Sequence, residues 1–401
     1  LVSAAAPARR STRELNQSNG MNTLPITNCW GRVTPVKLNV EHFTIYRGVP
    51  DAAYAHQAQL TSLNGRLYAT WSLGIRDEED PGERMVCATS DDAGETWSEP
   101  RTIAAPYRGE VAMSVIVSSG ILVHEGKLIA FNGEWERTAA GCNPDGTRNE
   151  VNDISAKSHC HTCARVSADR GETWSAPVEV SPRLAGYMTP SRTASGRVIL
   201  PGHLTYPYTD DPSGLTGWRW AGLPGLEPDF VDIYDNMRAG NARAGSGQLY
   251  NEASFYQTDD GVLHMMLRNE TDAHRLGVTE SHDNGVTWSP PVLTDYTDNV
   301  CRAHFGRLPD GRYFGMSCPH PTERHRRRTP AMLALSEDGV TFDRHYIIGD
   351  EPEPTPRLPG LYKHGRYGYP YLHVMGEHGF VIYSVAKEDI AVGRFVLGDL
   401  Q

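Results

Sequence analysis

Five basic side chains follow one another in a chain that is otherwise acidic. The run Arg324-His325-Arg326-Arg327-Arg328 stands out because the formal net charge of the whole chain is −11. Guanidinium groups bind carboxylates through paired, charge-assisted hydrogen bonds. The run therefore predicts that at least one of its arginines binds an anion, and the alternative is a solvated basic loop.

A second group of residues combines Cys and His side chains, which are metal ligands and disulfide partners. The segment His159-Cys160-His161-Thr162-Cys163 resembles half a zinc site, but no second Cys/His pair follows at the spacing of a zinc finger. We therefore expect a disulfide or free thiols here, and no metal ion at the functional site. Cys301 and Cys318 flank the turn Pro309-Asp310-Gly311 symmetrically, where a hairpin would bring them within reach of a disulfide.

Composition argues against several classes of function. With 38 Lys and Arg against 49 Asp and Glu, the chain does not suit a nucleic-acid partner, because phosphates select a basic surface. No apolar run approaches the roughly 18 residues that a membrane span needs. The sequence has no Gly-rich nucleotide loop, no Ser-centred nucleophile elbow and no HExxH motif, so no cofactor is implied for the chemistry. An acidic chain with many Trp and Tyr suits a carbohydrate-active protein.

Residues 1–25 are expected to be the remnant of a signal or pro-segment, or a flexible N-terminus. The chain begins with small residues, Leu1-Val2-Ser3-Ala4-Ala5-Ala6-Pro7-Ala8, and Arg9-Arg10 follow, which is typical of a processed leader. Asn16 and Asn269 each begin a glycosylation sequon. With seven Cys in the chain, these features favour a secreted, extracellular glycoprotein.

One pattern, S-x-D-x-G-x-T-W, recurs along the chain and decides the fold. Three full copies and a shortened fourth lie at 90–97, 167–174, 281–288 and 336–342. Asp and Ser can hydrogen-bond the backbone of a turn, Gly permits a positive φ, and Trp packs under the hairpin. We therefore expect Asp92, Asp169 and Asp283 to stabilise turns and not to take part in catalysis.

Six glycine-containing turns divide the chain into repeats. They are Asn64-Gly65, Glu125-Gly126, Ser195-Gly196, Asp260-Gly261, Asp310-Gly311 and His378-Gly379. Each joins two strand-like apolar runs, and their spacing corresponds to one four-stranded antiparallel blade per repeat. The predicted fold class is an all-β β-propeller, with residues 26–401 as a single catalytic domain. Residues 26–48 supply further strands, which close the last blade or help to build a seventh.

The repeated pattern is the Asp box of the sialidase-like β-propellers, and the chain resembles that family from Tyr54 onward. In sialidases three arginines hold a substrate carboxylate, a Tyr–Glu pair forms the nucleophile and an Asp is the acid/base. The resemblance implies that Glu252 and Tyr369 form the pair. It further implies that Arg268 is the second arginine and that the third lies in Arg326-Arg327-Arg328.

The chain departs from the sialidases at the first arginine. His56, in the segment Tyr54-Ala55-His56-Gln57-Ala58, occupies that place, and the acid/base Asp has no clear counterpart. A histidine can accept and return a proton near neutral pH. β-Elimination on a uronate needs such a base at C5, beside a positive group that stabilises the carboxylate. We therefore interpret His56 as the catalytic acid/base, with Arg268, Arg327 and Arg328 available for the carboxylate.

This combination is similar to the L-rhamnose-α-1,4-D-glucuronate lyases and the related rhamnosidase-like enzymes, which have seven blades and a catalytic His. The resemblance implies that terminal rhamnosyl-glucuronate of arabinogalactan, as in gum arabic, is cleaved to rhamnose and an unsaturated glucuronate. Two alternatives stay open: an exo-acting glycoside hydrolase, sialidase-like or an α-L-rhamnosidase, and a non-enzymatic glycan-binding propeller. The expected partner is thus an acidic carbohydrate, bound by a monomer that has room for a structural Ca²⁺ in its channel.

Further candidates for substrate binding lie near the predicted strand starts. We expect Arg302 and Gln57 to line the channel, although Arg302 with His304 also fits an ordinary exposed pair. Arg137 and Trp135 are expected to wall a sugar subsite.

Overall fold

The computed structural model describes residues 26–145, 147–149, 157–181, 188–226, 240–319 and 328–401. The expected N-terminal remnant, residues 1–25, lies outside these ranges, and so does Arg327. The strands, in chain order, are β1 (Thr27–Asn28), β2 (Val36–Lys37), β3 (Glu41–Tyr46), β4 (Tyr54–Leu63), β5 (Arg66–Gly74), β6 (Arg84–Ser90), β7 (Arg101–Ala104), β8 (Val115–His124), β9 (Lys127–Arg137), β10 (Lys157–Ser167), β11 (Val178–Ser181), β12 (Ser191–Arg192), β13 (Val198–Ile199), β14 (Tyr208–Thr209), β15 (Tyr250–Gln257), β16 (Leu263–Asn269), β17 (Arg275–Ser281), β18 (Val292–Thr297), β19 (His304–Arg307), β20 (Tyr313–Ser317), β21 (Ala331–Ser336), β22 (Thr341–Phe342), β23 (Arg344–Gly349), β24 (Gly368–Met375), β25 (His378–Val385) and β26 (Asp389–Val396).

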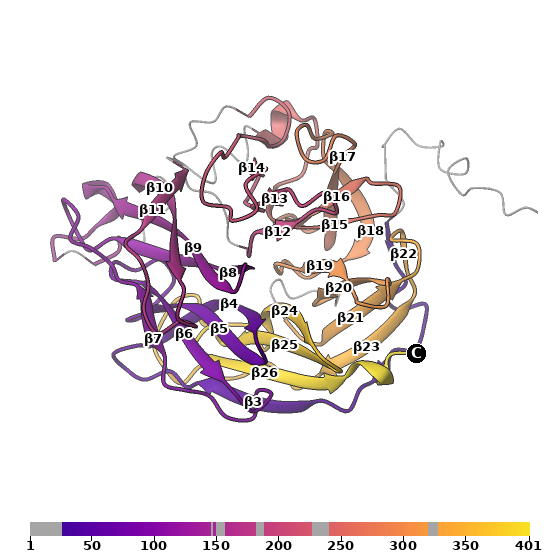
Figure 1. Ribbon diagram of the computed structural model, residues 1–401, viewed down its shortest axis with the longest axis horizontal. Helices are drawn as coiled ribbons and strands as arrows, with labels where there is room; N and C mark the ends of the chain where they lie inside the picture. Colours follow the sequence, from indigo (N-terminus) through magenta and orange to yellow (C-terminus); the bar gives the residue numbers. More distant parts are fainter. Residues whose placement is uncertain (1–25, 146, 150–156, 182–187, 227–239, 320–327) are drawn as a thin grey trace, which may run out of the picture.

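These strands form six sheets arranged as the blades of a propeller (Figure 1). Within most blades, successive strands pair antiparallel in chain order, as in β4-β5-β6-β7 and β8-β9-β10-β11. The first strand of each blade lies nearest the centre of the ring and the last at its rim (Figure 1). The all-β propeller predicted from the repeats is therefore confirmed. Among the described residues, no helix is long and apolar enough to cross a bilayer.

The N-terminal strands join existing blades. β3 pairs antiparallel with β26 and completes the sixth blade, with Phe43 opposite Val392. β2 runs parallel to β23, and β1 runs parallel to both β18 and β22. Of the two alternatives for residues 26–48, β3 thus closes the last blade, whereas β1 and β2 add to the fourth and fifth blades. The seventh blade implied by the lyase resemblance is not formed by the described residues, because the strands that would start it are already paired.

The Asp boxes lie at outer hairpins and stabilise them. In the first box, Oδ1 of Asp92 accepts hydrogen bonds from Ser90 Oγ (2.8 Å) and from the backbone N–H of Thr96 (2.9 Å). The indole N–H of Trp97 donates to the carbonyl of Gly94, which has a φ of +86°. Asp169 and Asp283 make the same contacts in their boxes. The hydrogen bonds from Thr96, followed by that from Ser90, lower the pKa of Asp92 to about 2.

The third blade contains an Asp box that the sequence pattern did not predict. Asp211 accepts hydrogen bonds from the Ser213 and Thr216 side chains, at 2.8 and 2.9 Å. Trp218 donates its indole N–H to the carbonyl of Gly214 at 2.9 Å, as in the other boxes. The pattern was missed because a Thr replaces the leading Ser and because extra residues separate Asp, Gly and Trp.

Cys301 and Cys318 flank the β19–β20 hairpin, as expected, but both are buried free thiols. They lie in the apolar cluster between the fifth and sixth blades, together with Met316 and Tyr369. The predicted position of the pair is therefore right, whereas the disulfide is not formed. One predicted turn is also shifted, since the β24–β25 turn lies at 376–377 and His378 already begins β25.

Candidate active site

Three innermost strands carry a β-bulge at the same place near their start. The pairing register shifts between His56 and Gln59 in β4, between Asn251 and Ala253 in β15, and between 368 and 371 in β24. At each bulge a non-glycine residue has a positive φ: Gln57 (58°), Glu252 (22°) and Tyr369 (55°). Bulges redirect side chains, and such backbone conformations cost on the order of 1–3 kcal/mol unless the surroundings hold them. The three bulges lie at the candidate site.

Glu252, Arg268 and Tyr369 form one buried hydrogen-bonded group across the ring. The hydroxyl of Tyr369 donates to Oε1 of Glu252 at 2.6 Å. Arg268 donates from Nη1 to the Tyr369 hydroxyl at 2.6 Å and also to Oε2 of Glu252. The Tyr–Glu pair implied by the sialidase resemblance is thus brought together by the structure, from strands of the fourth and sixth blades.

His56 lies against the other side of Tyr369. The two ring centroids are 4.2 Å apart. Nδ1 of His56 lies 2.6 Å from Oγ of Ser384, whose hydroxyl points at the carbonyl of Gly368 (3.4 Å). Because Ser384 donates to that carbonyl, it accepts the proton of Nδ1. Nε2 of His56 is therefore the unprotonated nitrogen, and it is buried without a hydrogen-bond partner among the described residues.

Three guanidinium groups surround the Tyr369 ring. The Cζ atoms of Arg302, Arg328 and Arg268 lie 4.5, 4.8 and 5.8 Å from its centroid. All three side chains are buried. Among the described residues Glu252 and Glu270 pair with Arg268. Three buried cations at one place favour an anionic ligand such as a carboxylate.

The arginines differ in how far they are already paired. Arg268 uses both Nη atoms on Glu252, Tyr369 and Glu270, the last at 2.5 Å. Nε and Nη1 of Arg328, by contrast, are buried without a partner among the described residues. Arg328 is therefore better placed than Arg268 to bind a substrate carboxylate, and Arg268 mainly positions Glu252 and Tyr369.

The charges of the site set the protonation states of its acids and bases. Burial alone raises the pKa of Glu252, but Arg268, His203 and Arg302 lower it more strongly, so the pKa is about 2. Burial raises the pKa of Tyr369 well above its usual range, against the opposing effect of Arg268. Burial, then the charges of Lys387 and the arginines, lowers the pKa of His56 well below 6.5. At neutral pH the site thus holds a carboxylate, a protonated phenol and a neutral imidazole.

Two predicted site residues lie elsewhere. Trp135 is fully buried in an apolar cluster with Val115 and Tyr250, so it packs the core and does not wall a subsite. Arg137 donates from Nε and Nη2 to the carbonyl of Glu79, at 3.0 and 2.8 Å, and so holds the 77–83 loop. Side chains alternate between the two faces of β9, but the sequence does not show which face is buried in the core.

Gln57 lies beside His56, but its side chain is already bonded within the fold. It is buried, and its Oε1 accepts a 2.6 Å hydrogen bond from Ser72. Arg302 is buried beneath Tyr369 and is no ordinary exposed residue, whereas His304 stacks on Tyr371 at 3.9 Å and accepts from the Leu372 N–H.

Lys387 and Glu78 are site neighbours that the sequence reasoning missed. Lys387 Nζ lies 2.5 Å from Oε2 of Glu78, and after burial its charge is the largest contribution that lowers the pKa of His56. The pairing of strands within each hairpin could have placed both residues near the site. Tyr54 pairs with Gly74 and 368 with 384, so the loops that follow β5 and β25 return to the starts of β4 and β24.

The described residues offer little for the expected Ca²⁺. Within them, one group of three side chains, Glu134, His161 and Cys163, converges as metal ligands would. A set with a single carboxylate does not fit Ca²⁺, which takes six to eight oxygen ligands. A structural Ca²⁺ therefore stays a prediction.

The ring of Asp-box blades and the Arg–Tyr–Glu group at its centre define a sialidase-like β-propeller. Residues 65–382 match the family described as BNR repeat-like domain, and the chain belongs to that family. A search of the curated proteins finds no match.

Solved structures of similar fold include sialidases. A protein of unknown function from Dyadobacter fermentans is 18% identical over 89% of this chain and 99% of its own, with a TM-score of 0.61. The NanB sialidase of Streptococcus pneumoniae is 15% identical over 92% and 71% of the two chains, with a TM-score of 0.60. Trypanosoma rangeli sialidase, in complex with sialic acid, is 13% identical over 92% and 60%, with a TM-score of 0.62. At these identities the likeness is one of fold.

Proposed function

We propose that this protein is a polysaccharide lyase that cleaves terminal L-rhamnose-α-1,4-D-glucuronate by β-elimination. The single observation that carries the proposal is the unpaired Nε2 of His56, buried beside Tyr369 and the arginines. A neutral imidazole with a fixed tautomer is a ready proton acceptor. The expected secretion of the chain fits an extracellular arabinogalactan substrate.

The reaction needs one base and one positive site. Nε2 of His56 takes the proton from C5 of the glucuronate, the electrons form the C4–C5 double bond, and the C4–O bond to rhamnose breaks. In a gluco-configured uronate the C5–H and C4–O bonds lie on the same face of the ring. The imidazolium can therefore return its proton to the leaving oxygen, which departs as the hydroxyl of rhamnose.

The arginines stabilise the charge that moves into the carboxylate when C5 loses its proton. Arg328 has two unpaired N–H donors for that group, and Arg302 adds a second positive charge nearby. Preorganised donors in a buried site stabilise such a transition state without reorganising. The bound carboxylate also offsets the cationic field on His56, which favours proton uptake by the imidazole.

A glycoside hydrolase is the second candidate, and the Tyr369–Glu252 hydrogen bond favours it. A sialidase-type hydrolase uses such a pair as a covalent nucleophile, with Glu252 drawing the proton from the phenol. In the lyase, the same pair orients the sugar and Tyr369 keeps its proton.

Incubation with gum arabic distinguishes the two. A lyase releases rhamnose and leaves a conjugated glucuronate that absorbs in the ultraviolet, in equal amounts. A hydrolase releases a sugar without any new absorbance, and a glycan-binding propeller releases nothing while retaining affinity for the polysaccharide. Release of rhamnose without the unsaturated product would refute the lyase.

A further inference from the structure

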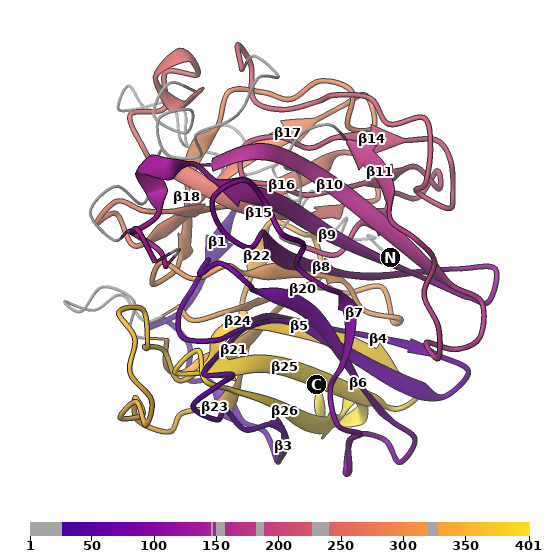
Figure 2. The same cartoon turned by 90° about the vertical axis from the view of Figure 1, so that its left-hand side faces the viewer.

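The strands β9 and β10 of the second blade carry a group of polar side chains away from the candidate active site. β9 and β10 run side by side over most of their length (Figure 2). A bulge in β10 between Ser158 and His161, with His159 at a φ of 51°, places His161 opposite Glu134. Cys163 follows two residues later, so its side chain is on the same face of the strand as that of His161.

The three ligand-type atoms of Glu134, His161 and Cys163 converge. All of them lie within 4.8 Å of one another. Nε2 of His161 is 3.2 Å from Oε2 of Glu134. Glu134 and Cys163 are buried, whereas the His161 side chain is 22% exposed and leaves an entrance from solvent.

Hydrogen bonds around this group fix which atoms face inward. Nδ1 of His161 lies 2.9 Å from the carbonyl of His159, so Nδ1 carries a proton and Nε2 points at Glu134. Oε1 of Glu134 accepts from Asn132 Nδ2 (2.8 Å) and from Arg165 Nη2 (3.0 Å), so Oε2 is the oxygen turned towards His161. At 3.2 Å, Nε2 and the carboxylate oxygen share either a proton or a cation, and a metal ion can take the place of the proton.

We propose that Glu134, His161 and Cys163 form a binding site for Zn²⁺ or a similar borderline divalent metal ion. Imidazole, thiolate and carboxylate are the three ligand types of zinc. Zinc–ligand bonds of roughly 2.0–2.3 Å set the ligand atoms of a tetrahedral site about 3.3–3.8 Å apart. The His161–Glu134 distance of 3.2 Å lies just below this spacing, and no pair has to close by more than about 1 Å to reach its upper end.

The surroundings resemble the outer shell of a metal site. Metal-bound imidazoles commonly donate their second N–H to a backbone carbonyl, as His161 does to His159. Arg165 and Asn132 orient the carboxylate from the outer side, and Arg165 Nη1 also donates to Asn132 Oδ1 at 2.5 Å. Three protein ligands leave the fourth position for water.

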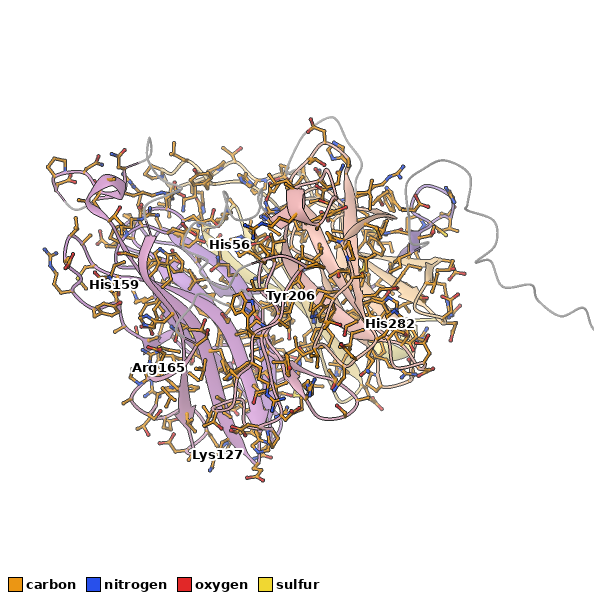
Figure 3. The ribbon with its side chains drawn as sticks, turned by 90° about the horizontal axis from the view of Figure 1, so that it is seen from above. His56, Lys127, His159, Arg165, Tyr206 and His282 are labelled. Atoms are coloured by element: carbon orange, nitrogen blue, oxygen red, sulfur yellow. The ribbon has the colours of Figure 1, made fainter. Side chains whose placement is uncertain are left out.

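This site is separate from the proposed active site. Figure 3 shows His159 and Arg165, which flank it, well to one side of His56. Its occupancy is therefore expected to affect the second blade and not the chemistry at His56.

The test is zinc titration of the full chain after dialysis against a chelator. We expect one Zn²⁺ per chain and a raised melting temperature. Cys163→Ser and His161→Gln should each weaken zinc binding by at least about tenfold. Cys160→Ser and His159→Gln change the same residue types at adjacent positions and should bind as the parent does.

Loading the parent chain with Co²⁺ tests the site without relying on the folding of any variant. The parent chain loaded with Co²⁺ should show the near-ultraviolet charge-transfer band of a thiolate–cobalt bond. The proposal is overturned if the parent takes up no Zn²⁺, if its cobalt spectrum lacks this band, or if Cys163→Ser binds zinc as tightly as the parent.

Discussion

The hydroxyl of Tyr369 lies 2.6 Å from Oε1 of Glu252, although the two residues belong to the sixth and fourth blades. Both residues have a positive φ at a bulge of an innermost strand. The pair therefore forms only when separate blades have closed into a ring, so the site is complete only in the fully folded propeller.

Removing the imidazole of His56 should abolish elimination and leave binding intact. A positioned general base contributes about 10²- to 10⁴-fold in rate. We expect His56→Ala and His56→Phe to lose most of the unsaturated product, to keep the affinity for the rhamnosyl-glucuronate disaccharide, and to melt close to the parent. Rate, affinity and melting temperature are measured on the same preparations. A well-folded variant with substantial turnover would show that the base lies elsewhere.

The dependence of kcat/KM on pH should reflect the lowered pKa of His56. The neutral imidazole is the base, and burial with Lys387 and the arginines holds its pKa well below 6.5. We therefore expect kcat/KM to stay constant as pH falls through 6.5 and to decline only in more acidic solution. Lys387→Met removes a charge that lowers this pKa, so the pKa rises and the acid limb moves to higher pH.

Lys37→Met is the matched control for that experiment. Lys37 is 66% exposed and pairs with Asp350 at the rim, far from the ring centre. Its profile should coincide with that of the parent. If the acid limb does not move in Lys387→Met, the group that titrates there is not His56.

Arg328 should contribute to binding of the substrate carboxylate. Truncating one partner of a buried charge pair costs about 2–4 kcal/mol, or roughly 30- to 1,000-fold in affinity. We expect Arg328→Ala to weaken binding of the acidic disaccharide by this factor and to weaken binding of its methyl ester far less. Calorimetry measures both affinities. Equal losses for acid and ester would mean that Arg328 shapes the site without contacting the carboxylate.

Tyr369 should not become covalently attached to a sugar. Burial raises its pKa well above the usual range, and the sequence resemblance predicts His56 in place of the first arginine of sialidases. A fluorinated sialic-acid analogue, followed by intact mass spectrometry, is expected to leave the chain unlabelled, while a retaining sialidase treated in parallel gains one label. Stoichiometric modification of Tyr369 would establish the hydrolase instead.

The Asp box of the third blade should stabilise the fold without affecting catalysis. Asp211→Ala removes the hydrogen bonds to Ser213 and Thr216. We expect the melting temperature to fall by on the order of 1–4 °C, with unchanged kcat/KM. Asp210→Ala is the control, because Asp210 is exposed and pairs with Arg197 outside the box. Equal effects of the two substitutions would argue against a box at Asp211.

The fold could be predicted because its signals are local. Each Asp box is a short turn whose Ser, Asp, Gly and Trp hydrogen-bond one another, so the pattern can be read without knowing the rest of the chain. The box at Asp211 escaped because its spacing is irregular. The six hairpin turns match the six sheets, and only the lyase resemblance implied a seventh blade. The pairing of β3 with β26, which closes the last blade, is long-range and leaves no trace in composition.

The site was only partly predictable because it is assembled from distant segments. His56, Glu252, Arg268 and Tyr369 were identified by family resemblance, and the structure brings all four together. The prediction for Trp135 was wrong because the sequence does not show which face of β9 packs against the third and fourth blades. The bulges at Gln57, Glu252 and Tyr369 could not be predicted, because non-glycine residues occupy these positive-φ positions and give no sequence signal for them.

The pairing of β3 with β26 also constrains how the molecule is made. Arg394 and Glu41, which bond across these strands at 2.8 Å, are 353 positions apart in the chain. During synthesis β3 emerges early and must wait, with an open hydrogen-bonding edge, until almost the whole chain has left the ribosome. The sheet of the last blade can therefore be completed only after β26 has been made, and this long-range contact adds to the contact order that slows folding.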